Sequence, residues 1–369
     1  MSALQQYAQA LVQAIQAMDG HAVASLLDIR GAASRTRAQA ILSGVSGVNV
    51  RAAVGGGGGG GGSAGGGSQA TSSSSTALSE QLKRCSALRD GWERVAACCL
   101  CASSALATAC DAVVFSYTRD ALHESAFQNC LQEASGSWIV VPLLRLVADC
   151  EAISFHPSCF PTRLERDREL QNLVDPVRNL FSFCVNDKSV EVLSEGKRIG
   201  SLAIANLLLK LNFKLNVPKQ GTFVLQALHR PILEPNKLGF FPKAQVVTLK
   251  YYMGRLNMFE DKYAEAEADL GYAFRYCHAG PEYHGQRRRI LEALIPVRLT
   301  LGILPSQRLL EEYGFTRQYS GIVSGLREGN IPAYRNALEQ NLEAFIKCGV
   351  YLTLDKLQLL VLRTVIKRM

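Results

Sequence analysis

The spacing of small residues between positions 250 and 278 restricts the fold of this chain more than any other feature. Gly254, Ala266 and Ala273 follow a Gly-x11-Ala-x6-Ala pattern, which is typical of a tetratricopeptide-like helical hairpin. Apolar residues recur at helical spacing on both sides of the polar turn 260–262, among them Tyr252 and Leu256 before it and Leu270 and Phe274 after it. Such a hairpin cannot bury its apolar face alone, so the pattern predicts further helix pairs stacked on it.

A second set of small residues extends the pattern. Gly325, Ala337 and Ala344 repeat the first set with a shift of 71 residues, which is close to two tetratricopeptide periods of about 34 residues each. Helices are expected between the two sets, over 288–301 and 306–313. The chain from about residue 201 onward is therefore predicted to be a right-handed stack of helix pairs, an all-α architecture that offers binding surface rather than a catalytic pocket.

The predicted organisation has four parts. Residues 1–54 form an N-terminal helical segment, and 55–76 a disordered linker, because eight consecutive glycines at 55–62 and the Gly/Ser bias after them cannot offset the entropy of ordering. Helical repeats follow over 77–235, and a further helical domain over 236–369. The glycine run is not a phosphate-binding loop, because no Gly-Lys-Ser/Thr follows it.

Helical periodicity also predicts the individual elements. The expected helices outside the hairpins cover 3–18, 78–111, 112–134, 137–155, 163–173, 175–183, 199–216, 222–229 and 354–367. Met18 is expected on the apolar stripe of the first of these. No secretory signal opens the chain, and no segment reaches the roughly 20 apolar residues of a membrane span, so membrane insertion is not expected.

The net charge of +8 is unevenly distributed. Residues 281–369 hold thirteen Lys and Arg against eight Asp and Glu, which places +5 of the total there. A basic end suggests a polyanionic partner, although solvated helix surfaces have the same composition.

No motif for catalysis or metal binding is present, so the sequence favours a non-enzyme without a cofactor. Cys98, Cys99, Cys101 and Cys110 lie in an apolar helical run without a nearby histidine, which predicts buried free thiols rather than a zinc site. Cys277, His278 and His284 lack a fourth ligand. A catalytic triad assembled from distant residues stays open at this point.

Several stretches carry a resemblance to a known family. They are Tyr251-Tyr252-x-Gly254-Arg255-x-x-Met258-Phe259, Ala266-Glu267-x-x-Leu270-x-x-Ala273-Phe274-x-x-Cys277-His278, Arg289-Ile290-Leu291-x-x-Leu294-Ile295-Pro296-Val297, Gly329-Asn330, and Phe345-Ile346-x-Cys348-Gly349-x-Tyr351-Leu352-x-Leu354-x-Lys356-Leu357. They resemble the PCI-domain subunits of the nuclear mRNA-export complex that couples transcription to the pore, a family also described as similar to a COP9-signalosome subunit.

The resemblance implies a helical-repeat superhelix capped by a winged helix, of which this chain would supply only the first helix. It also implies two protein partners, a large scaffold subunit and a small acidic protein, with which the subunit forms a basic surface for RNA or double-stranded DNA. The implied location is the nucleus, at the nuclear pore, and an additional cytoplasmic pool is compatible with it.

The leading hypothesis is therefore an adaptor subunit for mRNA export. Its candidate phosphate contacts are Arg287, Arg288, Arg289, Arg363, Lys367 and Arg368, and the alternative for each of them is a solvated helix end. The second hypothesis is a scaffold subunit of another PCI assembly, the proteasome lid or the signalosome, in which the repeats would bind only protein.

Overall fold

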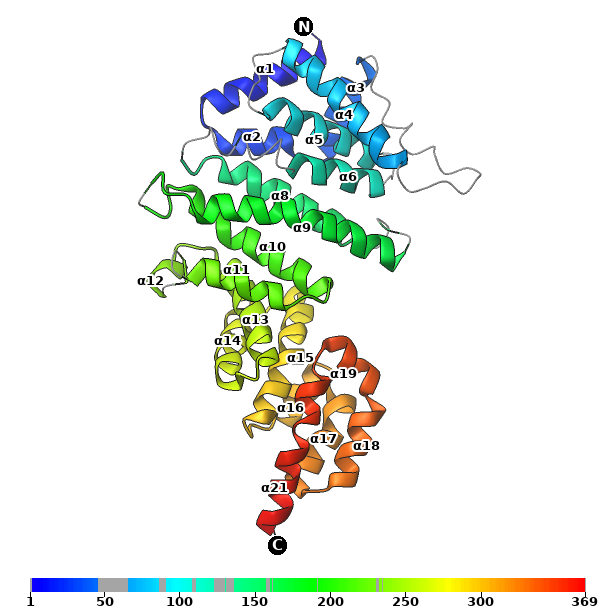
Figure 1. The fold of residues 1–369 in the computed structure, drawn as a ribbon, viewed down its shortest axis with the longest axis vertical. Helices are drawn as coiled ribbons and strands as arrows, with labels where there is room; N and C mark the ends of the chain where they lie inside the picture. Colours follow the sequence, from blue (N-terminus) through cyan, green and yellow to red (C-terminus); the bar gives the residue numbers. More distant parts are fainter. Residues whose placement is uncertain are drawn as a thin grey trace, which may run out of the picture. The chain divides into compact units, whose positions relative to one another are not determined.

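The computed structural model describes residues 2–45, 66–85, 91–107, 111–122, 130, 136–156, 160, 162–190, 192–229, 232–233 and 235–368. All regular elements in these residues are helices (Figure 1), so the predicted all-α, helical-repeat class is confirmed. No helix among them is both long and apolar enough to cross a membrane.

The helices divide between two compact units. Unit 1 comprises residues 1–220 and 226–240, and unit 2 comprises 221–225 and 241–369. Helix α11 (Lys219–His229) contributes residues to both. The division at 240 lies five residues from the predicted boundary at 235, whereas the N-terminal helices share a unit with the repeats that follow them.

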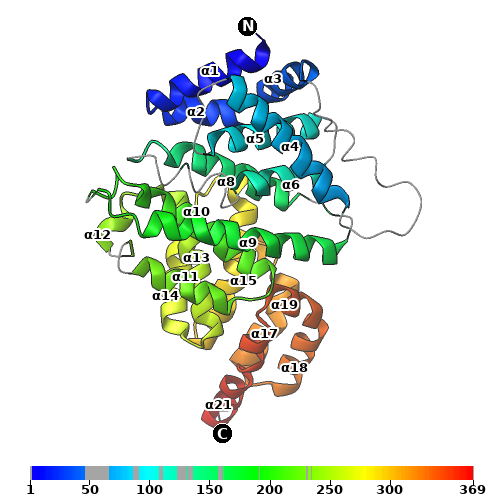
Figure 2. The same cartoon turned by 45° about the horizontal axis from the view of Figure 1, so that its top comes forward.

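Unit 1 contains ten α-helices in its described residues. They are α1 (Ala3–Gln16), α2 (Gly20–Leu27), α3 (Ala32–Ser43), α4 (Gly66–Cys85), α5 (Trp92–Ala107), α6 (Asp111–Leu122), α8 (Val140–Ser154), α9 (Arg163–Val185), α10 (Ser201–Lys214) and α12 (Pro235–Leu238). Helices α5 and α6 pair, α3 packs on α5, and α2 packs on α8 (Figure 2). Helix α10 is buried on nearly all sides, as its apolar sequence predicts.

The first helix shows how local sequence sets an element. Ser2 and Gln5 form a reciprocal capping box that satisfies two free N–H groups at the start of α1. The helix ends at Gln16, two residues earlier than expected, because Met18 adopts a left-handed φ of +54° before Asp19 caps α2. Met18 is 57% exposed, so its predicted place on the buried stripe is wrong.

Three further predicted boundaries in unit 1 need correction. Helix α9 runs unbroken through both expected helices at 163–173 and 175–183, with Pro176 inside it. A proline costs a helix interior about 3 kcal/mol, which the continuous buried face around Leu173, Val177 and Leu180 offsets. The expected helix 78–111 is instead the end of α4 and the whole of α5.

The third correction concerns the linker. Residues 55–65 lie outside the described residues, but α4 begins at Gly66, inside the range expected to be disordered. Ser74 and Ser75 are buried, and α4 packs on α5 and α6. A serine-rich composition suggests a linker, but in α4 the small serine side chains allow close helix packing.

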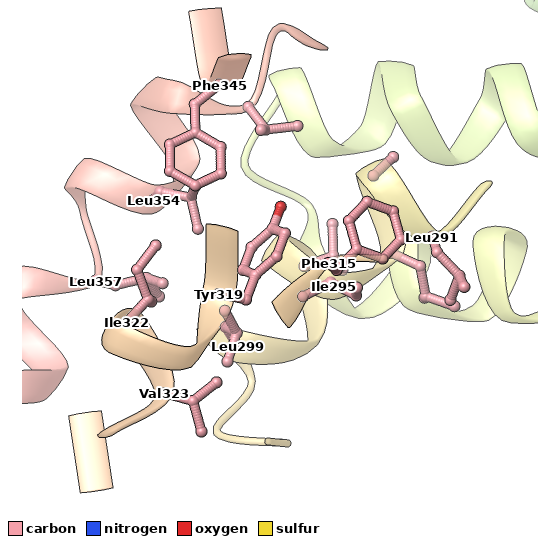
Figure 3. Packing of buried hydrophobic residues seen from close by; sticks show 14 of the residues in the cluster. Leu291, Ile295, Leu299, Phe315, Tyr319, Ile322, Val323, Phe345, Leu354 and Leu357 are labelled. Atoms are coloured by element: carbon pink, nitrogen blue, oxygen red, sulfur yellow. The ribbon is translucent and has the colours of Figure 1, made fainter. Parts of the chain in front are cut away.

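Unit 2 carries the two predicted hairpins. Its helices are α13 (Lys243–Phe259), α14 (Tyr263–Tyr276), α15 (His284–Thr300), α16 (Gln307–Glu312), α17 (Thr316–Glu328), α18 (Ile331–Gln340), α19 (Leu342–Cys348), α20 (Tyr351–Asp355) and α21 (Gln358–Arg368). A single hydrophobic core joins α13 and α14 to the later helices. Tyr319 lies near the centre of this core (Figure 3). Its ring centroid is 5.9 Å from that of Phe315 and 5.5 Å from that of Phe345.

The second hairpin pairs α17 with α18 (Figures 1 and 2), but its register differs from the first. A Cβ on Gly325 would lie 2.9 Å from the Cβ of Tyr334, and Ala337 instead faces Gly321, where a Cβ would come within 2.8 Å. Ala344 lies on the separate helix α19, because α18 ends at Gln340. Gly325 and Ala337 therefore lie on a helix pair, as Gly254 and Ala266 do, but their contacts differ from those of the first set, and Ala344 lies on a different helix from Ala337.

The last predicted helix is also divided. Residues 354–367 span the end of α20, a turn at Lys356 and Leu357, and α21. Leu354 and Leu357 are both buried, and the turn between the helices lets both side chains enter the core shown in Figure 3.

Candidate partner and nucleic-acid interface

The α13–α14 hairpin is built on close approach at Gly254. A Cβ there would lie 2.5 Å from the Cγ of Leu270 and 3.1 Å from the carbonyl oxygen of Ala266. Ala266, Leu270 and Ala273 are completely buried. The small residues at these positions are therefore required by helix packing, as their spacing predicts.

A buried carboxylate fixes the same hairpin. Asp269 of α14 accepts hydrogen bonds from the Nζ of Lys250 at 2.7 Å and from the Nδ2 of Asn257 at 3.0 Å, both on α13. Asp269 is 8% exposed, and a buried charge is tolerated when it is paired and hydrogen-bonded in this way. Lys250 and Asp269 thus act within the fold and are not available to a partner.

The turn of the hairpin contacts the C-terminal helices. The two carboxylate oxygens of Asp261 accept hydrogen bonds from the Nζ of Lys356 at 2.5 and 2.6 Å, and the hydroxyl of Tyr263 donates to Asp261 at 2.6 Å. The hydrogen bond from Lys356 holds the pKa of Asp261 below its usual value. Burial, helped by the hydrogen bond to Asp261, raises the pKa of Tyr263 to about 12.

A second contact joins α13 to α19. Arg255 of α13 donates from a guanidinium nitrogen to the carbonyl oxygen of Cys348 at 3.3 Å. Arg255 and Cys348 belong to the first and the last of the stretches that carry the family resemblance. Lys356 belongs to the last stretch, and Asp261 lies in the turn between the first two. Stretches about 90 residues apart in the chain therefore meet at one place in unit 2.

Two of the six candidate phosphate contacts have internal roles. Arg287 donates to the hydroxyl of Tyr313 at 2.8 Å and to the carbonyl oxygen of Cys277 at 3.1 Å, and its guanidinium lies 4.2 Å from the ring centroid of Phe274. Arg288 donates to the carbonyl oxygen of Tyr313 and lies 4.3 Å from the ring of Phe315. Both guanidinium groups join α15 to neighbouring segments, so the structure does not support them as phosphate contacts.

The internal role of Arg287 gives a prediction about stability. Replacing Arg287 with alanine leaves the hydroxyl of Tyr313 and a backbone carbonyl without their donor, which should destabilise unit 2 by about 2 kcal/mol. Thermal unfolding followed by circular dichroism measures the change. Arg289→Ala is the matched control, since Arg289 is exposed and no loss is expected; equal stability of the two variants would contradict the assignment.

The remaining candidates lie on the surface. Arg289 is exposed on α15, and Arg363 and Lys367 are exposed one helical turn apart on α21. Among the described residues, no hydrogen bond or ion pair engages these three side chains. The side chain of Arg368 lies outside the described residues.

Helix α21 also presents an apolar stripe that the sequence interpretation did not identify. Leu359, Leu362 and Ile366 are 72%, 37% and 72% exposed, and their spacing of three and four residues places them on one helix face. Val361, on the opposite side, is completely buried, and α21 packs there on α17 and α18. The sequence did contain a signal for it: apolar residues occur on two faces of α21, of which one is buried and the other is exposed.

Basic residues border this stripe on one side. Arg363 and Lys367 follow Leu362 and Ile366 by one position each, and α21 contains no acidic residue. The stripe, defined by Leu359, Leu362 and Ile366, is thus an amphipathic surface with a purely basic border. Such a surface is suited to an apolar partner segment that carries acidic residues.

The thiols and histidines form no further site in the described part of the chain. Burial raises the pKa of Cys98 and Cys99 well above the usual value and that of Cys101 to about 12, which makes these thiols unreactive. Cys110 lies outside the described residues. No group of three or more His, Cys, Asp or Glu side chains in the described residues is placed to hold a metal ion, and this includes Cys277, His278 and His284.

Several known proteins are similar to this chain. No model of a protein family matches the chain. The chain is 31% identical to PCI domain-containing protein 2 of Danio rerio over 199 residues, which are 54% of this chain and 48% of that protein. It is 32% identical to the CSN12 homologue of Gibberella zeae over 213 residues, 57% of this chain and 46% of that protein.

A plant protein is similar over a shorter region. The chain is 35% identical to enhanced ethylene response protein 5 of Arabidopsis thaliana over 172 residues, 47% of this chain and 40% of that protein. Each match thus covers less than half of the relative's length. Over about half of its own length, the chain is therefore related to PCI domain-containing proteins and CSN12 homologues, whose names support a PCI-type helical domain.

Proposed function

We propose that this protein is a non-catalytic scaffold subunit of a nuclear complex that couples transcription to mRNA export. Similarity to PCI domain-containing protein 2 supports a subunit of a multiprotein assembly. The proposed partners are a large scaffold subunit and a small acidic protein, and the proposed location is the nucleus, at the nuclear pore.

The stripe on α21 is the observation that carries this proposal. Three apolar side chains on one face of a helix, two of them about three-quarters exposed, are unfavourable in water and are typical of a protein–protein contact. The basic border of Arg363 and Lys367 favours an acidic partner through charge complementarity. A scaffold role therefore accounts for both the apolar and the charged side chains of α21.

A second candidate function is a PCI scaffold subunit of a proteasome-lid or COP9-signalosome-type assembly. The names of two fungal relatives, which are CSN12 homologues, favour it. In that assembly the repeats would bind only protein, and Arg363 and Lys367 would contact carboxylates rather than phosphates.

Isolation of the native complex separates the two candidates. A tagged full-length chain is purified from nuclear extract, and its stoichiometric partners are identified by mass spectrometry. We expect an export-complex scaffold subunit and a small acidic protein. Signalosome or proteasome-lid subunits in their place would establish the second candidate and contradict the first.

The basic border also gives a prediction for nucleic-acid binding. If Arg363 and Lys367 contact phosphates, replacing both with alanine should reduce the slope of log K against log salt concentration by about 1.4 for single-stranded RNA. Fluorescence anisotropy at several salt concentrations measures the slope. Lys188→Ala with Lys219→Ala removes two exposed cations of unit 1 and serves as the control; an equal change in both double variants would contradict a specific role for α21.

A further inference from the structure

Aromatic and basic side chains gather where α14 ends and α15 begins. Four rings, of Tyr276, His278, Tyr283 and His284, lie within nine consecutive positions of the sequence. Arginines at positions 275, 287, 288 and 289 surround them, and Glu282 is the one acidic residue in the stretch 275–289. Packing within unit 2 accounts for Arg287 and Arg288, but neither it nor the scaffold role accounts for the rings of Tyr276, His278 and Tyr283 beside exposed arginines.

Arg287 holds the connection in place. Its guanidinium donates to the carbonyl oxygens of Phe274 at 3.4 Å and Cys277 at 3.1 Å, which joins the start of α15 to the end of α14. The backbone N–H of Gly280 donates to the Nδ1 of His278 at 3.1 Å. The rings are therefore carried by a segment whose backbone has fixed partners, which lowers the entropy lost when a ligand binds.

The rings are arranged in adjacent pairs. Tyr276 lies 4.4 Å from Tyr272, centroid to centroid, and is 44% exposed. The rings of His278 and Tyr283 lie 4.9 Å apart and are tilted by 51°. Tyr276 and His278 are exposed and Tyr283 is half-buried, so a flat group from solvent can reach these rings.

One cation lies next to Tyr276, and two more exposed cations belong to the same stretch of α14 and α15. The Nζ of Lys243 is 5.6 Å from the ring centroid of Tyr276, and Arg275 and Arg289 are exposed. The carboxylate of Glu282 lies against Gly280: its Oε1 is 2.5 Å from the position that a Cβ on Gly280 would take.

His284 is less suited to the role. It stacks on Tyr313 at 4.8 Å, and its Nε2 lies 3.2 Å from the carbonyl oxygen of Glu312. Glu311 and Glu312 are both exposed there, so the basic character is strongest on the side of Tyr276, His278 and Tyr283.

We propose that Tyr276, His278 and Tyr283 are a stacking platform for the bases of single-stranded RNA, and that the exposed cations Lys243, Arg275 and Arg289 contact its phosphates. Exposed rings combined with cations bind single strands because every base has a face to stack, whereas the bases of a duplex are already stacked on one another. The choice of RNA rests on the proposed function in mRNA export. The platform differs from the stripe on α21 in elements and in chemistry, since it has rings in place of aliphatic side chains.

The test replaces both tyrosines in the full-length chain. Tyr276→Ala with Tyr283→Ala should weaken binding of a fluorescein-labelled oligouridylate of about 12 nucleotides by about tenfold or more. Tyr276→Phe with Tyr283→Phe keeps the rings and should bind within about twofold of the unsubstituted chain. Fluorescence anisotropy measures both, and circular dichroism confirms that the variants unfold at the same temperature.

Photocrosslinking locates the contact without any substitution. The same oligonucleotide with 5-iodouridine should crosslink to Tyr276, His278 or Tyr283 in the unsubstituted chain. Crosslinks confined to other residues, an alanine variant that binds like the unsubstituted chain, or absence of binding by the unsubstituted chain would each overturn the platform. If one of those outcomes occurs while export-complex subunits co-purify, the platform is wrong and the export role stands. If signalosome or proteasome-lid subunits co-purify instead, the export role alone is overturned.

Discussion

Replacing Gly254 with leucine is expected to destabilise unit 2 by about 3 kcal/mol. The first added atom would lie 2.5 Å from the Cγ of Leu270 and 3.1 Å from a backbone oxygen of Ala266. Leu270 is completely buried and belongs to the main core of the unit, so it cannot move aside without opening that core. The clash should therefore push α13 away from α14.

Urea unfolding followed by circular dichroism measures the effect as a shift in the midpoint of the unit 2 transition. Gly285→Leu is the matched control, because a Cβ at Gly285 on α15 meets no atom within 4 Å. A midpoint unchanged in Gly254→Leu, or changed equally in both variants, would show that small residues do not set the helix spacing.

The second large effect is expected on assembly. Leu359→Asp with Ile366→Asp places two carboxylates in the stripe on α21 and should reduce recovery of the proposed partner subunits about 100-fold or more, as expected for the centre of an interface. Both side chains are 72% exposed, so the unfolding temperature of the free chain should not change. Quantitative mass spectrometry of the purified complex gives the measurement.

Ile303→Asp is the control for this loss, because Ile303 is a 49% exposed apolar residue in the loop after α15. It should leave recovery of the partners unchanged. Full recovery with the α21 double variant would contradict a role for the stripe in assembly, and equal loss with Ile303→Asp would mean that the effect is not specific to α21.

The first hairpin was predictable because its determinants are local. Gly254, Ala266 and Leu270 lie within 17 consecutive positions, and two helices joined by a short turn bring them together. The second hairpin was predictable only as a pair of helices. Its turn at Gly329 and Asn330 has two residues, with Gly329 at a left-handed φ of +75°, whereas the first turn has three; the shorter turn displaces α18 along α17 and changes which side chains meet.

The roles of the arginines could not be predicted from their own neighbourhood. Arg287 and Arg288 look like exposed basic residues in the sequence, and their partner Tyr313 follows 25 to 26 residues later. The pairing of Asp261 with Lys356 spans 95 residues. A single sequence contains no signal for contacts at such separations, since they depend on how whole helices pack.

Hydrogen–deuterium exchange in α21 tests the central claim most directly, namely that this helical scaffold binds a partner protein through its exposed stripe. The exchange of a peptide covering Gln358–Arg368 is compared between the free chain and the complex purified from nuclear extract. Burial of the stripe should slow exchange by roughly tenfold or more, with a smaller change in the loop around Ile303. Equal exchange of this peptide in the free chain and in the complex would contradict the account.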